Sequence, residues 1–371
     1  MTIGIVKEPS FETRVSMLPD IAAAFLKQGI EVFIETGAGN NAYAADASYT
    51  SKGIKTESRN NILKQADIIL CMHPLPDEDI SLLKKGAIAT GVYQPLFNAA
   101  QMHSWAAKGI TTFSLDMIPR TTRAQSMDVL SSQANIAGYK AVLLAANIYP
   151  RYFPMFMTAA GSITPAKVLI LGAGVAGLQA IATARRLGAV VEVFDTRPAV
   201  KEEVMSLGAK FIEVEGAADA SKAGGYAVEQ TEEYKQRQQQ KITDSVAKAD
   251  VVITTAQIPG KKAPILITDA MLVNMKPGSV IIDIAAATGG NTPHTKNNET
   301  VNYNGVSIVG NSALAATTPG DASKMYGKNV SNFLQLIITK EGQINLNFED
   351  DIVKGCCITH DGKVVNERVI V

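Results

Sequence analysis

The sequence predicts an α/β protein made of two Rossmann-like, doubly wound domains with parallel sheets, linked by long helices. Short apolar, β-branched runs alternate with helical patterns along most of the chain, which is typical of βαβ units. The chain has 371 residues, too many for one ordinary hydrophobic core, so two domains are expected. Two long helix-compatible stretches, 128–149 and 321–342, flank the second series of strand-like runs.

The first third of the chain carries one βαβ series. Its strand-like runs are 2–6, 31–35, 66–71, 87–93 and 111–115. Segment 18–29 lies between the first two runs, with Pro19 near its start and Gly29 at its end. That placement of proline and glycine is typical of a helix.

A second series follows a loop-like segment rich in Pro, Met and aromatic residues. Its strand-like runs are 167–174, 189–195, 209–214, 249–256 and 278–286. Because a long helix flanks the series on each side, we expect the chain to leave the first domain and later return to it. The first domain is predicted to comprise 1–127 plus 320–371, and the second 128–319.

Segment 215–241 is polar and contains a Gly-Gly pair. It has two interpretations: a disordered surface loop that runs into a polar helix, or a mobile lid, because long loops in compact α/β domains are often functional.

Composition excludes several classes of protein. The 35 basic side chains balance 35 acidic ones, which argues against a general nucleic-acid or anionic-membrane binder. No apolar run reaches the roughly 18 residues of a membrane span, and charged residues interrupt the N-terminus within eight positions. Three cysteines cannot build a disulfide framework. We expect an intracellular protein without direct membrane insertion.

The strongest local signal is "LILGAGVAGLQAIATARRLGA", in which Gly172, Gly174 and Gly177 form G-x-G-x-x-G between a strand and a helix. The first glycine allows the tight turn, the second lets the backbone approach a pyrophosphate, and the third permits close helix–strand packing. Val175 and Ala176 open the helix, whose N-terminal N–H groups favour phosphate. The motif predicts an NAD(H) site in the interdomain cleft, against the alternative of a purely structural βαβ turn.

Asp195 ends the second strand of this series, about 18 residues after Gly177, near the spacing of a ribose-binding acid. A carboxylate there would accept hydrogen bonds from the ribose hydroxyls and repel a 2′-phosphate, so NAD is favoured over NADP. Thr196 and Arg197 follow, and Arg197 leaves the preference partly open because an arginine can accommodate that phosphate.

The usual general bases and metal ligands are sparse. His103, His294 and His360 are each interpreted as ordinary surface or core residues, and His73 is better placed but is followed at once by Pro74. Cys356 and Cys357 lack a histidine at metal-ligand spacing within their run, so no metal site is predicted.

Five stretches together resemble the NAD(H)-binding component of proton-translocating NAD(P) transhydrogenase, a family related to alanine dehydrogenase. They are "IGIVKEPSFETRVSMLP", "TGAGNNAYAADASY", "IPRTTRAQSMDVLSSQ", "AAGSITPAKVLILGAGVAGLQAIATARRLGA" and "LNFEDDIV". The resemblance implies direct hydride transfer between two nicotinamides, which requires positioning rather than acid–base chemistry.

The resemblance also implies roles for individual residues. Asp128 and Arg120 would bind the nicotinamide carboxamide, Gln125 would reach toward the partner nucleotide, and Ser131 would add a carboxamide contact. Tyr226 would fold over the nucleotide from the polar segment. The residues expected beside the adenosine are Thr255 and Ala256.

Alanine dehydrogenases differ at the substrate site. Their substrate-binding Lys, catalytic His and active-site Asp match Met72, Gln94 and Ala287 here, and only Arg14 is retained. The chain also departs from the transhydrogenase pattern in 310–323, where Ala313, Ala315 and Thr317 replace a polar residue, a Pro and an Arg.

The resemblance implies a homodimer that works with a separate NADP(H)-binding and membrane-spanning partner. It places the chain in the cytoplasm, peripheral to the inner membrane through that partner. Two alternatives stay open: an amino-acid dehydrogenase of the alanine dehydrogenase type, and a non-catalytic NAD-binding paralogue.

Overall fold

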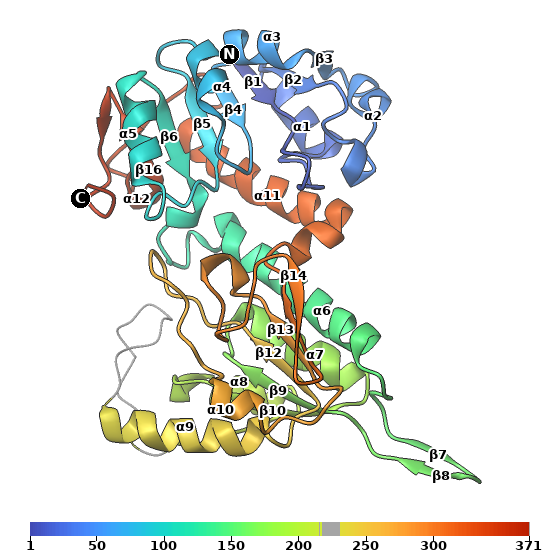
Figure 1. Ribbon diagram of the computed structural model, residues 1–371. Coiled ribbons are helices and arrows are strands. Elements are labelled where there is room, and N and C mark those ends of the chain that lie inside the picture. The colour runs from blue at the N-terminus through green and yellow to red at the C-terminus, as the bar shows by residue number, and fades with distance from the viewer. Residues whose placement is uncertain (215, 217–230, 371) are drawn as a thin grey trace. The chain divides into compact units, whose positions relative to one another are not determined.

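The computed structural model describes residues 1–214, 216 and 231–370. The chain forms two compact units (Figure 1). The first contains Met1–Gln133 and Ala316–Val371, and the second contains Ala134–Ala315. The division therefore falls a few residues away from the predicted limits of 127/128 and 319/320, because the first turn of one long helix packs with the first unit.

An eight-stranded sheet forms the centre of the first unit, in the order β17-β16-β6-β5-β4-β1-β2-β3. Its strands are β1 (Thr2–Ile5), β2 (Glu31–Glu35), β3 (Lys55–Glu57), β4 (Ile68–Leu70), β5 (Ile88–Gly91), β6 (Thr111–Ser114), β16 (Cys357–His360) and β17 (Lys363–Val364). The first six run parallel, whereas β16 is antiparallel to β6. The C-terminal tail thus completes the sheet as an antiparallel edge, which the sequence pattern did not predict.

Helices cover the sheet of the first unit. They are α1 (Pro19–Leu26), α2 (Asp46–Thr50), α3 (Arg59–Gln65), α4 (Asp77–Leu82), α5 (Ala99–Ala107), α11 (Pro319–Ile337) and α12 (Asp351–Cys356), with 3-10 turns η1 (Asn40–Ala42), η2 (Leu115–Met117) and η3 (Gln125–Met127). The long helix α6 (Val129–Ile148) begins in this unit and continues into the second. Predicted helix 321–342 is α11, which starts earlier at Pro319 and ends at Ile337, because Ile338 instead pairs with Ile344 as an extended bridge.

The second unit contains a seven-stranded sheet in the order β11-β10-β9-β12-β13-β15-β14. Its strands are β9 (Lys167–Leu171), β10 (Val190–Phe194), β11 (Lys210–Phe211), β12 (Val251–Thr254), β13 (Val280–Asp283), β14 (Glu299–Tyr303) and β15 (Val306–Gly310). All neighbours are parallel except β14 and β15, an antiparallel hairpin that turns at Asn304 and Gly305, both with positive φ. An Asn-Gly pair between apolar runs is a hairpin signal, so this element could have been found in the sequence.

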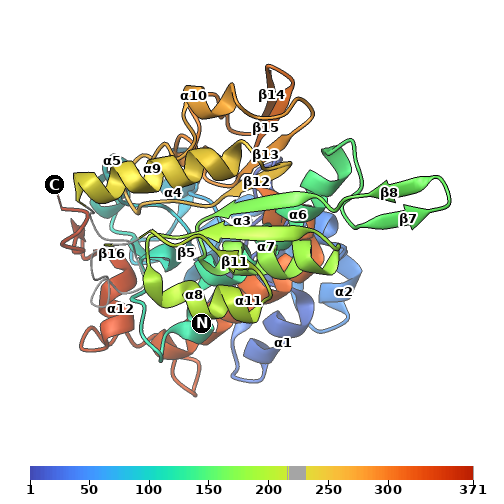
Figure 2. The same ribbon diagram turned by 90° about the horizontal axis from the view of Figure 1, so that it is seen from below.

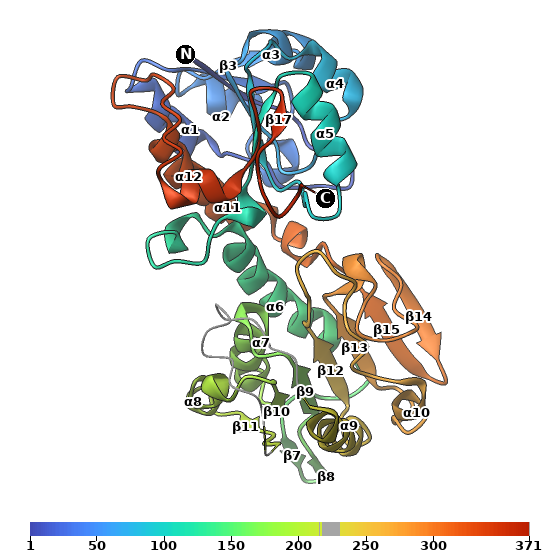
Figure 3. The same cartoon turned by 90° about the vertical axis from the view of Figure 1, so that its left-hand side faces the viewer.

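Helices lie on both faces of this second sheet (Figure 3). They are α7 (Val175–Arg186), α8 (Lys201–Ser206), α9 (Glu232–Val246) and α10 (Asp269–Leu272), with 3-10 turns η4 (Pro198–Val200), η5 (Ala286–Thr288) and η6 (Leu314–Thr317). Alternate residues of β9 face opposite ways: Val168 and Ile170 pack in the core with α7, whereas Leu169 and Leu171 pack in the core with α9 and α10. Strands with two buried faces explain the continuous apolar runs of the sequence.

A small antiparallel ribbon, β7 (Phe156–Thr158) and β8 (Gly161–Ile163), projects from the second unit (Figures 1 and 2). All six of its residues are exposed. The sequence pattern indicated a loop here, because a three-residue strand without a buried face leaves no alternation to detect. Among the described helices, none is both long and apolar enough to cross a membrane.

Candidate functional site

The glycine turn lies at the carboxyl end of β9, in the middle of the second sheet. The chain runs from β9 to β10 on one side and later returns to β12 on the other, so the strand order reverses beside β9. In open α/β sheets, ligands bind at such a switch point, outside the carboxyl ends of the strands. Gly172, Asp195 and Thr255 directly follow these three strands.

The three glycines of the turn have different structural requirements. Gly172 has φ +104, and a Cβ there would collide with the Thr255 hydroxyl. A Cβ at Gly177 would overlap the carbonyl oxygen of Gly172, so only glycine allows this approach of helix to strand. A Cβ at Gly174 would meet no described atom within 4 Å, so packing within the described chain does not demand a glycine there.

Helix α7 begins directly after Gly174, at Val175 and Ala176. The first N–H groups of a helix lack partners within it and carry partial positive charge. Helix α6 crosses this end of α7 closely, because a Cβ on Gly138 would overlap the carbonyl of Ala176. The close crossing fixes the position of the α7 N-terminus in the second unit.

Asp195 follows β10 and is 8% exposed. One carboxylate oxygen accepts hydrogen bonds from the Arg197 backbone N–H at 2.8 Å and from its Nε at 2.9 Å. The other accepts from the Ala173 N–H at 2.7 Å and from Arg197 Nη2 at 2.8 Å. The carboxylate therefore links the end of β10 to the glycine turn, and Arg197 covers it.

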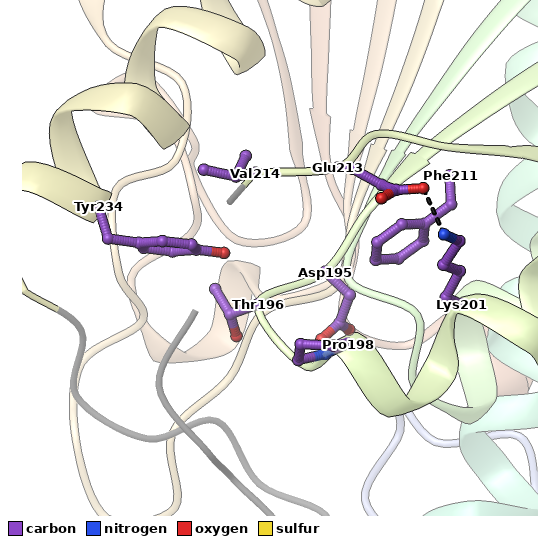
Figure 4. A pocket seen from close by; sticks show the side chains of 8 residues that line it. All are labelled: Asp195, Thr196, Pro198, Lys201, Phe211, Glu213, Val214 and Tyr234. Carbon is purple, nitrogen blue, oxygen red and sulfur yellow. Dashed lines mark ion pairs between the residues drawn. The ribbon is translucent and has the colours of Figure 1, made fainter. Parts of the chain in front are cut away.

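A pocket of about 80 Å³ lies beside Asp195 (Figure 4). Phe211, Val214 and Pro198 give it apolar walls, and Tyr234 of α9 points its hydroxyl inward from the opposite side. Lys201 and Glu213 form an ion pair at its rim. Thr196 also lines the pocket, so two predicted cofactor-binding residues lie together here.

The loop after β12 carries Thr255 and Ala256 and is fixed by Asn291, a residue that the sequence pattern did not reveal. Asn291 is fully buried; its Oδ1 accepts from the Ala256 N–H at 3.1 Å, and its Nδ2 donates to Ala256 O at 2.9 Å and Pro264 O at 2.8 Å. Asp283, also fully buried, accepts from the Asn291 N–H at 2.6 Å. The Gly-Gly pair directly before Asn291 was the available signal, because both glycines have positive φ.

The polar loop 118–128 of the first unit is anchored from two sides. Arg123 donates to both carboxylate oxygens of Asp350 at 2.6 and 2.9 Å, and Asp350 caps α12. Asn329 and Asn332 of α11 both donate to Ser126 O, at 2.8 and 2.9 Å. The side chains of Arg120 and Gln125 are exposed on this anchored loop.

Asp128 and Ser131 form the first turn of α6. Asp128 accepts from the Ser131 N–H at 2.8 Å and from its hydroxyl at 2.6 Å, which is the geometry of a helix N-cap. The two residues thus contact each other directly, and both are partly exposed.

A buried ionic cluster in the first unit also escaped prediction from the sequence. Arg14 donates from Nε and Nη2 to the two oxygens of Glu12, at 2.8 and 2.6 Å, and from Nη1 to Gln133 at 2.8 Å. His73 Nε2 lies 2.8 Å from Glu12. Burial opposes ionisation of Glu12, but the hydrogen bonds from Arg14 and His73 outweigh it and hold its pKa far below the ordinary value.

Glu8 lies next to this cluster and accepts from the backbone N–H groups of Met72 and His73, at 2.6 and 3.2 Å. Burial raises the pKa of Glu8 to about 7, against the effect of these two donors.

The remaining candidates lie apart. His294 Nε2 is 2.6 Å from Asp269, His360 Nδ1 is 3.1 Å from the Thr111 hydroxyl, and His103 lies on α5. The three cysteines are buried and free, and the described part of the chain holds no group of three potential metal ligands. Tyr226 lies outside the described residues.

Two family models match nearly the whole chain. The alanine dehydrogenase/PNT N-terminal domain matches residues 4–137, and the alanine dehydrogenase/PNT C-terminal domain matches residues 141–367. The chain belongs to the alanine dehydrogenase/PNT family. The resemblance and the two-domain α/β fold expected from the sequence are confirmed.

Within this family the chain is similar to transhydrogenase alpha subunits. It is 44% identical over 369 residues to an NAD(P) transhydrogenase alpha-subunit protein of Rickettsia prowazekii, covering 98% of this chain and 96% of that protein. The crystal structure of transhydrogenase from Sinorhizobium meliloti matches with a TM-score of 0.87 at 40% identity, covering 99% of each chain. A structure of L-alanine dehydrogenase matches with a TM-score of 0.81 at 23% identity, over 100% of this chain and 98% of that one, which shows the shared fold.

Proposed function

We propose that this chain is the NAD(H)-binding component of an NAD(P) transhydrogenase, which passes a hydride directly between NAD(H) on this chain and NADP(H) on a partner subunit. The observation that carries the proposal is the glycine turn at the switch point of the second sheet, with Asp195 at the end of the neighbouring strand. The relatives named NAD(P) transhydrogenase match the chain over almost its full length.

The second unit fits a dinucleotide in its residues. Gly174 leaves space for a ligand to approach the backbone, and the adjoining turn of α7 offers N–H groups to a pyrophosphate. Asp195 would bind the adenosine ribose, and the apolar walls of Phe211 and Val214 suit the flat adenine ring. Thr255 and Ala256 would lie along the nucleotide, on the loop that Asn291 holds.

The polar loop of the first unit would orient the nicotinamide. The reduced ring supplies the hydride, and this chain's task is to hold it about 3–3.5 Å from its acceptor. Asp128 and Ser131 would accept from the carboxamide NH₂, Arg120 would donate to its carbonyl, and Gln125, which is exposed, would face the partner nucleotide. The anchoring of the loop through Arg123 suits such positioning.

The geometry around Arg14 disfavours an amino-acid dehydrogenase. Its side chain donates to Glu12 and Gln133, so the one retained substrate-site residue is already engaged within the protein. Met72 is buried and cannot carry the charge of a lysine, and Ala287 offers no carboxylate. This arrangement neither binds a small carboxylate well nor moves a proton.

The proposal includes partners. A homodimer is favoured by the projecting ribbon β7–β8, because a two-stranded hairpin is marginal by itself in water and this one exposes Phe156, Met157 and Ile163. NADP(H) and the proton path would belong to separate subunits that span the membrane. The chain would then work at the cytoplasmic face of the inner membrane through them.

Hydride exchange in a complex reconstituted from this chain and its NADP(H)-binding partner tests the proposal. We expect transfer from NADH to an NADP⁺ analogue, and no reduction of NAD⁺ when alanine is supplied to the chain alone. Binding of NADH without any transfer in the complex would indicate a non-catalytic paralogue, and would locate the defect in the altered loop around Ala313, Ala315 and Thr317.

A further inference from the structure

The carboxylate of Asp195 is saturated with hydrogen bonds from within the chain. Four N–H groups donate to it, at 2.7 to 2.9 Å. A carboxylate offers about four lone-pair positions in its plane. A ribose can therefore reach Asp195 only if one or more of these donors leaves.

The four donors fall into two classes. The N–H groups of Ala173 and Arg197 belong to the backbone, which is fixed by the glycine turn and by the end of β10. The other two are Nε and Nη2 of the Arg197 side chain, one on each carboxylate oxygen. Only this side chain can rotate away without breaking the fold, and its departure frees one acceptor position on each oxygen.

Those two positions match the ribose of NAD(H). Its 2′- and 3′-hydroxyls are neighbouring donors that can bind the two oxygens of one carboxylate. NADP(H) carries a phosphate in place of the 2′-hydroxyl, so it offers one donor fewer and brings negative charge toward Asp195. The guanidinium of Arg197 neutralises that carboxylate and is itself a good partner for phosphate.

We propose that Arg197 is a specificity-determining residue that competes with the adenosine ribose for Asp195, weakening NAD(H) binding while making NADP(H) less unfavourable. The inference rests on the proposed NAD(H) site and deepens it. It accounts for an arginine two residues after a ribose-binding acid, where a simple NAD site would gain nothing from it.

The test is the affinity of the purified chain for NADH and for NADPH, measured by calorimetry in wild type and in Arg197→Ala. We expect NADH to bind about threefold or more tightly in the variant, because a partly buried ion pair no longer has to be broken. NADPH should bind more weakly, because Asp195 then repels the 2′-phosphate. The ratio of the two dissociation constants should rise by about tenfold or more.

Two further variants separate competition from charge. Arg197→Lys keeps the charge but cannot donate two N–H groups side by side, so we expect tighter NADH binding with NADPH affinity near that of the wild type. Lys210→Ala removes a cation on the same sheet that pairs with Glu192 and does not touch Asp195, so both affinities should stay within about twofold of wild type.

The outcomes are distinguishable. A ratio unchanged in Arg197→Ala, or NADH binding that weakens with it, would overturn the inference while the nucleotide site stands. A wild-type chain that binds neither nucleotide would overturn the proposed function and this inference together. Thermal melts of the nucleotide-free variants show whether each one is folded.

Discussion

Asp128 accepts two hydrogen bonds from Ser131 and thereby combines a structural contact with its proposed place at the nicotinamide. An N-cap can be kept while the charge is removed, because asparagine caps helices about as well as aspartate does. The chemical and structural roles of this residue can therefore be separated by substitution. The same holds for Gln125, which is exposed and whose side chain can be changed without disturbing the core.

Asp128→Asn and Gln125→Asn should slow single-turnover hydride transfer on the order of 10²-fold, because a ring misplaced by about 1 Å loses that much rate. Both variants should melt within a few degrees of wild type, since exposed polar substitutions shift stability by about 0.5 kcal/mol or less. Thr122→Ala, exposed on the same loop, is the control and should change neither quantity. Variants that melt early but transfer hydride normally would show that the loop is structural.

Glu8 makes stability depend on pH. Its pKa is raised from 4.5 to about 7 by burial, so its contribution to stability is complete below about pH 4.5 and is lost as the pH rises through 7. The free energy of unfolding should fall by about 1–3 kcal/mol between pH 5 and pH 8. Glu12 has the opposite sign, because its pKa is lowered and its contribution is lost only in acid.

Denaturant titrations of wild type and Glu8→Gln across that range measure this dependence. The glutamine stays neutral, so the variant should show a flatter profile than wild type above pH 5. Equal slopes in the two proteins would mean that another group, such as His73, carries the titration.

At the scale of elements, the crossing of α6 and α7 controls the phosphate-facing end of α7. A methyl group on Gly138 would overlap the carbonyl of Ala176, which is backbone and cannot move without shifting the helix. The crossing therefore makes an indirect requirement of the proposed nucleotide site, carried by a residue that would not touch the nucleotide.

Gly138→Ala should destabilise the protein by about 1–3 kcal/mol through overpacking and should also weaken NADH binding. Gly320→Ala is a matched control, because a Cβ there meets nothing within 4 Å in α11. We expect the control to bind NADH normally and to melt at or slightly above the wild-type temperature, since alanine favours a helix. Normal NADH affinity in Gly138→Ala would show that the position of the α7 end does not limit binding.

At the scale of the whole molecule, each unit has its own buried core, and the ribbon β7–β8 lies outside both. The rings of Tyr152 and Phe156 stack at 5.3 Å on this exposed segment, and Met157 is 71% exposed. Such an apolar projection is costly in water unless it is covered. A second copy of the chain is the occupant that we propose.

Met157→Glu should shift the protein from dimer to monomer in sedimentation experiments, because a charge is buried poorly at an apolar interface. NADH affinity per chain should remain unchanged. Met205→Glu changes a methionine that is 55% exposed on α8 and should leave the association state as it is. A dimer that survives Met157→Glu at micromolar concentration would exclude the ribbon as its interface.

The sequence by itself determined the series of parallel strands, the long helix α6 and the glycine turn before α7. These are local signals: apolar runs such as 31–35 record a strand with two buried faces, and Gly172 records a backbone that must adopt positive φ. The nature of the site followed from the same turn together with the family resemblance.

Only the tertiary structure decided the pairings between distant residues. Arg123 meets Asp350 across 227 positions, β16 completes a sheet that began with the first residues, and Asn291 holds a loop 35 positions earlier. Even between near neighbours, the sequence contains both Asp195 and Arg197 but does not show that one covers the other. Local patterns encode burial and backbone shape, whereas a side chain's partners depend on where the folded chain brings each group, and that is a property of the whole molecule.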